Sequence, residues 1–91
     1  MLPIVTKIGD YTPSSLDWTI AVNAVSGPVT IQLPLATITG QTYNIKSASN
    51  ATGPITVAPT GGQTIDGEAS QILGAYENLL VQSDGTNWLI L

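Results

Sequence analysis

Carboxylates are the only side chains in this sequence that offer acid–base chemistry. The chain contains no histidine and no cysteine, which excludes Ser-His-Asp and Cys-His nucleophilic sites and most zinc sites. The closest pair of acids is Asp66 and Glu68, two residues apart and therefore able to share one face. A solvated turn around Gly67 is the interpretation that we favour for this pair. We predict that the chain is not an enzyme and that it holds no metal and no cofactor.

Aromatic side chains could instead form a platform on which a sugar stacks. The candidates are Trp18, Trp88, Tyr11, Tyr43 and Tyr76. Because the chain has no phenylalanine, the two tryptophans are the largest apolar side chains available to fill a core. Trp88 precedes the apolar residues 89–91, which indicates burial. We interpret the aromatics as anchors of a core or an interface, with carbohydrate binding as the alternative.

The charge content limits the classes of partner that the chain could bind. Lys7 and Lys46 are the only cations, and the net charge is −4, so neither nucleic acid nor an anionic membrane finds the cluster of cations that it needs. Only 9% of the residues are charged, against about 25% in an ordinary soluble domain. Hydrophobic residues make up 43% of the chain. We therefore expect at least one face to be buried against another subunit.

Alternation of apolar and polar residues predicts the strands that position these side chains. The alternating stretches are 18–24, 29–33, 43–46 and 55–57. Residues two apart share a face, so each stretch has an apolar face and a Thr/Asn/Gln face. Turn residues recur about every 8–12 residues, which is typical of sandwiches and barrels. The prediction is a single all-β domain over residues 1–91, a small antiparallel β-sandwich or barrel.

Two local patterns refine this prediction. Ser83-Asp84-Gly85-Thr86 predicts a hairpin with arms 79–82 and 87–91, because Asp-Gly suits the positive φ angles of a tight two-residue turn. Gly27-Pro28-Val29-Thr30-Ile31 is echoed by Gly53-Pro54-Ile55-Thr56-Val57. A solenoid needs about three copies to bury its core. The repeat therefore has two open interpretations: two similar hairpins within one domain, or chance similarity among Thr-rich strands.

An ordered series of motifs resembles a module of tailed-bacteriophage virion proteins, found in tail fibres and in head fibre or decoration proteins. The series spans Val29 to Leu91, about two-thirds of the chain. Its members are Val29-Thr30-Ile31-Gln32-Leu33-Pro34, Gly40-Gln41-Thr42-Tyr43-Asn44-Ile45-Lys46, Ile55-Thr56-Val57, Gly62-Gln63-Thr64-Ile65-Asp66-Gly67 and Gln82-Ser83-Asp84-Gly85-Thr86-Asn87-Trp88.

This resemblance implies a β domain that forms a homotrimer in a virion and has no enzymatic activity. Such modules usually end long fibre chains, whereas this sequence opens at Met1 without the features of a secretory signal. We therefore expect a trimeric capsid decoration (cement) protein, made in the host cytoplasm and located on the outer surface of the phage head. Its partners would be itself and the major capsid protein. The alternative is a trimeric tail-fibre or receptor/glycan-binding module.

Two sets of residues are candidates for these contacts. The apolar face of the last strands would pack at the threefold axis, using Leu79, Val81, Trp88 and Ile90. Residues 1–10 would form an extended N-terminal arm, since Pro3 suits an extended segment. The arm would bind the capsid through Leu2, Pro3, Ile4, Val5 and Ile8.

Overall fold

The computed structural model describes residues 2–25, 27–48 and 53–91. Within these residues the chain forms eight β-strands and no helix, so no helix capable of crossing a membrane occurs there. The strands are β1 (Ile4–Lys7), β2 (Thr19–Val22), β3 (Val29–Gln32), β4 (Thr42–Ser47), β5 (Ile55–Ala58), β6 (Gln71–Leu73), β7 (Asn78–Ser83) and β8 (Trp88–Ile90). The predicted all-β class is confirmed for this part of the chain.

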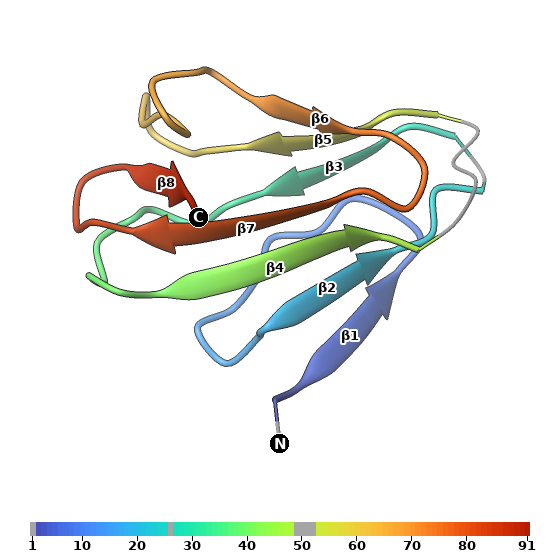
Figure 1. The fold of residues 1–91 in the computed structure, drawn as a ribbon, viewed down its shortest axis with the longest axis horizontal. Coiled ribbons are helices and arrows are strands. Elements are labelled where there is room, and N and C mark those ends of the chain that lie inside the picture. The colour runs from blue at the N-terminus through green and yellow to red at the C-terminus, as the bar shows by residue number, and fades with distance from the viewer. Residues whose placement is uncertain (1, 26, 49–52) are drawn as a thin grey trace.

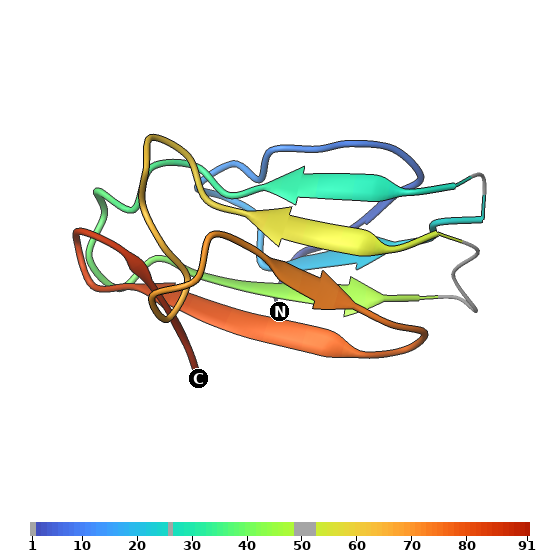
Figure 2. The same ribbon diagram turned by 90° about the horizontal axis from the view of Figure 1, so that it is seen from above.

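The strands form two sheets that lie one over the other. The larger sheet has the order β1-β2-β4-β7-β8, and the smaller one has the order β3-β5-β6 (Figure 1). Figure 2 shows the two layers from above, with β3, β5 and β6 in one layer and β4 and β7 in the other. This sandwich-like arrangement agrees with the coarser part of the predicted fold.

Half of the strand pairings are parallel, which corrects the expectation of an antiparallel sandwich. Parallel pairs are β1 with β2, β2 with β4, and β3 with β5, whereas β4 with β7, β5 with β6, and β7 with β8 are antiparallel. A parallel neighbour needs a long return connection. Here the return from β2 to β4 passes through β3 in the opposite sheet, and the return from β3 to β5 passes through β4. From β1 to β5 the chain therefore coils like a solenoid. The strands β6, β7 and β8 then run antiparallel to the strands with which they pair.

The two Gly-Pro repeats are neighbouring strands of this winding. β3 and β5 pair in register, with Val29 opposite Ile55 and Thr30 opposite Thr56. Equivalent residues of the repeat thus occupy equivalent positions one coil apart. The interpretation as two similar hairpins is wrong, because the two copies are strands of one sheet that pair with each other in parallel.

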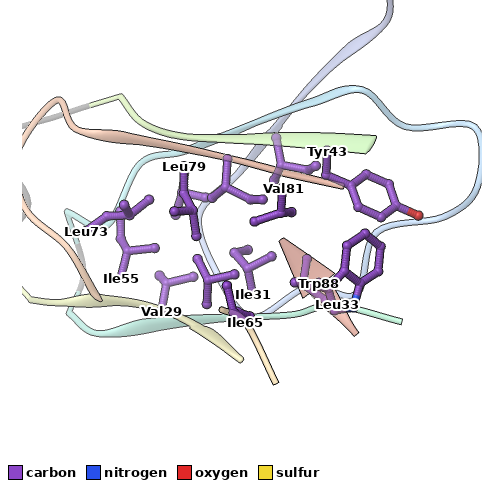
Figure 3. Packing of buried hydrophobic residues seen from close by; sticks show 14 of the residues in the cluster. Val29, Ile31, Leu33, Tyr43, Ile55, Ile65, Leu73, Leu79, Val81 and Trp88 are labelled. Carbon is purple, nitrogen blue, oxygen red and sulfur yellow. The ribbon is translucent and has the colours of Figure 1, made fainter. Parts of the chain in front are cut away.

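The core lies between the sheets and is built from the apolar face of each strand. Ile20, Ile31, Ile45 and Val81 have no exposed surface, and Figure 3 shows side chains of both layers interlocking. Trp88 is also fully buried, and its ring centroid lies 5.6 Å from that of Tyr43. The predicted burial of this tryptophan is confirmed.

The predicted C-terminal hairpin is confirmed, but its turn differs from the prediction, because four residues, 84–87, connect β7 to β8 instead of two. β7 and β8 pair with Ser83 opposite Trp88. Gly85 has a φ of 98°, as the turn requires. Asp84 contributes through its side chain, whose Oδ1 accepts hydrogen bonds from the backbone N–H groups of Thr86 (2.9 Å) and Asn87 (2.8 Å).

The N-terminal segment is extended, as expected, but it is not an arm separate from the domain. β1 pairs with β2 along its entire length, with Ile4 opposite Thr19 and Lys7 opposite Val22. Val5 packs against the core. The strand is therefore held by both backbone pairing and apolar contact.

Candidate interaction surfaces

The residues expected at a trimer interface lie mostly inside the protomer. Leu79 is 8% exposed, and Val81 and Trp88 are fully buried. Ile90 is partly buried and packs against the same core. The alternation of β7 and β8 turns these side chains toward the opposite sheet, so the first three have almost no surface left for a neighbouring copy. This corrects the expectation, since an interface on these strands would use the opposite face, where Leu89 is 42% exposed.

The proposed capsid-binding residues do form an apolar surface on β1 and its flanks. Leu2, Ile4 and Ile8 are 65%, 66% and 68% exposed. Pro3 is also exposed, whereas Val5 is half-buried. Four of the five expected residues are thus accessible to a partner, and the fifth ties the strand to the domain.

β1 is also a free sheet edge, visible at the lower right of Figure 1. The carbonyl groups of Pro3 and Lys7 accept hydrogen bonds of 3.2 and 2.8 Å from N–H groups at the two ends of β2. Bonded and unbonded residues alternate in a parallel ladder, so the backbone groups of Ile4 and Thr6 face away from the sheet. An edge of this kind can accept a strand from another chain.

A pocket of about 390 Å³ opens where the β1–β2 and β3–β4 connections meet. Its lining residues, none of them charged, are Pro13, Ser14, Ser15, Pro34, Leu35, Thr37, Ile38, Gln41 and Tyr43. Leu35 and Ile38 keep 51% and 57% of their surface exposed. The pocket is therefore suited to an uncharged group with apolar surface.

Buried groups fix one wall of this pocket. The Trp88 indole N–H donates to the Pro34 carbonyl at 3.2 Å, and the Ser83 hydroxyl donates to the Ala36 carbonyl at 2.9 Å. The Ala36 N–H donates to Oε1 of Gln63 at 2.8 Å. These bonds tie residues 34–36 to the core, so the wall is preformed.

A compact turn over residues 14–17 forms the opposite wall. Oδ2 of Asp17 accepts hydrogen bonds from the Tyr11 hydroxyl (2.5 Å) and the Ser14 N–H (2.9 Å). The Tyr43 hydroxyl donates to the Ser14 carbonyl at 3.0 Å. Leu16 stands on this turn and, at 83% exposed, has the highest exposed fraction among the large apolar side chains of the described residues.

The same hydrogen bonds shift two pKa values. Burial works against the charged form of Asp17, but hydrogen bonds from Tyr11 and Ser14 outweigh it and lower the pKa of this carboxyl. The hydrogen bond to Asp17, together with burial, raises the pKa of Tyr11 above its ordinary value. Both shifts favour the hydrogen-bonded pair, which stabilises the turn at neutral pH.

The acidic pair Asp66 and Glu68, considered above for acid–base chemistry, lies in a turn. Ile65 and Glu68 exchange backbone hydrogen bonds of 2.9 Å across Gly67, and Asp66 and Glu68 are both exposed. Oδ1 of Asp66 accepts a hydrogen bond of 3.1 Å from the Ile90 N–H. The predicted turn is confirmed, and Asp66 ties it to β8. Among the described residues, no three His, Cys, Asp or Glu side chains gather where they could hold a metal ion.

The aromatic side chains do not form a shared platform. Trp88 and Tyr43 are buried, and Trp18 and Tyr11 are half-buried. Tyr76 is 56% exposed and has a φ of 59°, unusual for a residue other than glycine. Its carbonyl accepts a hydrogen bond from Nζ of Lys46.

Sequence reasoning missed the pocket, because its two walls come from connections about 20 residues apart. The signals present in the sequence were Pro13 and Pro34, which indicate connections between strands without indicating that these connections meet. No protein-family model and no curated protein matches this chain. The phage resemblance therefore depends on the motifs themselves.

Proposed function

We propose that this chain is a structural subunit of a tailed-bacteriophage particle. In this proposal it acts as a homotrimeric decoration protein, bound to the major capsid protein on the outer surface of the head, and catalyses no reaction. Because such a protein binds only the assembled shell, it stabilises that shell by mass action. The proposal rests on the ordered motifs between Val29 and Leu91 and on the surface of the domain.

The observation that carries the proposal is the apolar surface. The described residues expose eleven large apolar side chains, whereas the chain has only two basic and six acidic residues. Several of the apolar side chains gather, on β1 and around the pocket, and an exposed cluster of this kind is typical of an interaction site. Two separate clusters suit a subunit that contacts both its own copies and a different protein.

The native mass of the purified chain tests the trimer. Light scattering over a dilution series should give three times 9.4 kDa at concentrations above the dissociation constant of the trimer. A mass of 9.4 kDa at every concentration would contradict the homotrimer and leave both clusters to other partners.

Point variants on β1 test the capsid contact better than removal of the strand. Deleting residues 2–8 would expose β2 and remove Val5 from the core, so a loss of binding would be ambiguous. Ile4→Ser and Leu2→Ser change exposed side chains and should lower capsid occupancy without lowering the unfolding temperature. Ile72→Ser, on the smaller sheet and 66% exposed, is the matched control. Unchanged occupancy in both β1 variants would refute the assignment.

The second candidate function is receptor or glycan binding, and Tyr76 is the observation that favours it. A tyrosine held at positive φ costs free energy that glycine would avoid, which points to a use for its exposed ring. Tyr76→Gly should then abolish attachment to host cells or glycans while capsid occupancy and particle stability stay unchanged. Attachment equal to that of the unmodified chain would exclude this role.

A further inference from the structure

A second pocket lies where the chain beyond β1 runs along β3. Its volume is about 200 Å³, and its lining residues are Asp10, Tyr11, Thr12, Thr30 and Gln32. None of these residues lines the larger pocket that contains Leu35 and Ile38. The larger pocket has no charged group, whereas this one has a carboxylate, and we refer to it as the Asp10 pocket.

Backbone pairing fixes the walls of the Asp10 pocket. In Figure 2 the connection that follows β1 runs beside β3. The Tyr11 N–H donates to the Thr30 carbonyl at 3.2 Å, and the Gln32 N–H donates to the Tyr11 carbonyl at 3.0 Å. Oδ1 of Asp10 accepts a hydrogen bond of 2.8 Å from the Thr30 N–H. The ring of Tyr11 packs against the core. The pocket is therefore formed before any ligand binds.

The polar side chains of the pocket are available to a ligand. Asp10, Thr12, Thr30 and Gln32 are all exposed. Within the described part of the chain, the two threonine hydroxyls and the Gln32 amide have no hydrogen-bond partner, and the Asp10 carboxylate uses one of its two oxygens. The carboxylate only accepts hydrogen bonds, whereas the hydroxyls and the amide both donate and accept. A ligand that carries several donors and acceptors would satisfy all four groups.

These groups fit a sugar better than an ion. No lysine or arginine lines the pocket, so an anion would meet Asp10 without a counter-charge. A divalent metal ion would find a single carboxylate there, fewer charged oxygens than such ions usually bind. An ammonium group only donates, and would leave the N–H groups of Gln32 without an acceptor. Neighbouring hydroxyls of a sugar ring both donate and accept.

The size of the pocket limits the ligand to one ring. Pockets for drug-sized molecules enclose about 300–1,000 Å³, whereas the Asp10 pocket encloses about 200 Å³. A longer saccharide would therefore place one unit in the pocket and leave the others outside it.

We propose that the Asp10 pocket binds one neutral pyranose unit of a glycan. The Asp10 oxygen that Thr30 leaves free accepts a hydrogen bond from one sugar hydroxyl, and Gln32 and the threonine hydroxyls hold neighbouring ones. The inference rests on glycan binding, the second candidate function, and assigns it to residues other than Tyr76. Because each hydrogen bond replaces one to water, we expect a dissociation constant of about 1–10 mM.

NMR titration of the isotope-labelled chain tests this site. The probes are the methyl glycosides of glucose, galactose, mannose and N-acetylglucosamine, each added to about 50 mM, several times the expected dissociation constant. At least one glycoside should shift the backbone amide signals of residues 10–12 and 30–32 in a saturable manner. Butylammonium chloride and calcium chloride, added separately, should not produce these shifts.

Two variants connect the shifts to the side chains. Asp10→Asn keeps an oxygen for the Thr30 N–H but loses the charge, and should weaken sugar binding about tenfold. Gln32→Ala should weaken it about two- to tenfold, since it removes the amide but leaves the backbone pairing of β3 intact. Glu68→Gln makes the same change of charge at an exposed residue outside the pocket, and should leave binding unchanged. All three variants should keep the unfolding temperature of the natural chain within a few degrees.

The outcomes separate this inference from the proposed functions. The inference is overturned if no glycoside shifts these signals, if only the ammonium or calcium salt does, or if both pocket variants bind as the natural chain does. Sugar-dependent shifts confined to the surroundings of Tyr76 overturn the Asp10 pocket and support the tyrosine as the glycan site. The trimer mass and the capsid occupancy are measured without sugar, so neither result depends on this pocket.

Discussion

At the scale of single residues, Trp88 links the core to the pocket. Its ring fills the space beside Tyr43, and its indole N–H holds the Pro34 carbonyl in the pocket wall. Trp88→Ala should lower the free energy of unfolding by about 3–5 kcal/mol, since it leaves a large cavity, as measured by urea denaturation. Leu89→Ala, on the outward face of the same strand, should cost less than about 1 kcal/mol. Equal losses in the two variants would contradict the placement of Trp88 in the core.

Asp84 makes stability depend on pH. Hydrogen bonds from the backbone N–H groups of Asn87 and Thr86 hold the pKa of its carboxyl below the ordinary value. The unfolded chain therefore takes up this proton at a higher pH than the folded chain. Stability from this group is present above the ordinary carboxyl pKa of about 4 and is lost as the pH falls through the lower folded value.

The variant Asp84→Asn isolates this contribution. The free energy of unfolding, measured by denaturation between about pH 5 and pH 2, should fall less steeply in the variant than in the natural chain. Identical slopes would mean that the hairpin turn does not depend on the charged form of Asp84.

At the scale of elements, the stacking of coils depends on a close approach between the two Gly-Pro repeats. A Cβ on Gly53 would overlap the backbone nitrogen of Pro28 and lie 2.6 Å from the carbonyl carbon of Gly27. Gly53→Ala should therefore destabilise the domain by about 1–3 kcal/mol. Gly9→Ala, where a Cβ would meet no atom within 4 Å, should change stability by less than about 1 kcal/mol. Thermal unfolding of the two variants checks this difference.

The strands also show which features of the fold the sequence patterns could predict and which they could not. Alternation placed β3, β4 and β5 within one or two residues and turned the correct side chains inward, because it reports which face of a strand is buried. It did not report the neighbour of each strand. β1 was expected as an arm because Pro3 suits an extended segment. In the folded chain only Val5 of its side chains packs against the core, so the sequence of this strand carries little alternation to reveal its pairing with β2.

At the scale of the molecule, the net charge affects the association of copies rather than the fold of each copy. Each copy has a net charge of −4, so copies of the chain repel one another in the proposed homotrimer. Raising NaCl from about 0.01 M to about 0.15 M should strengthen self-association, since salt screens the repulsion. Sedimentation equilibrium at the two salt concentrations measures it. Weaker association at the higher concentration would instead indicate an interface built on ion pairs.

Local patterns were enough to predict the all-β class, the C-terminal hairpin, the burial of Trp88 and the turn at Gly67, since each depends on neighbours in the chain. Tertiary structure alone decided that the repeats stack as parallel coils, that residues 4–7 form the edge of a sheet, and that residues 13–15 meet residues 34–41 around a pocket. The physical reason is that alternation and turn residues constrain a strand and its faces, whereas the partner of each strand is selected by packing between segments far apart in sequence. The interaction surfaces depend on that packing, and so they became visible only in the folded chain.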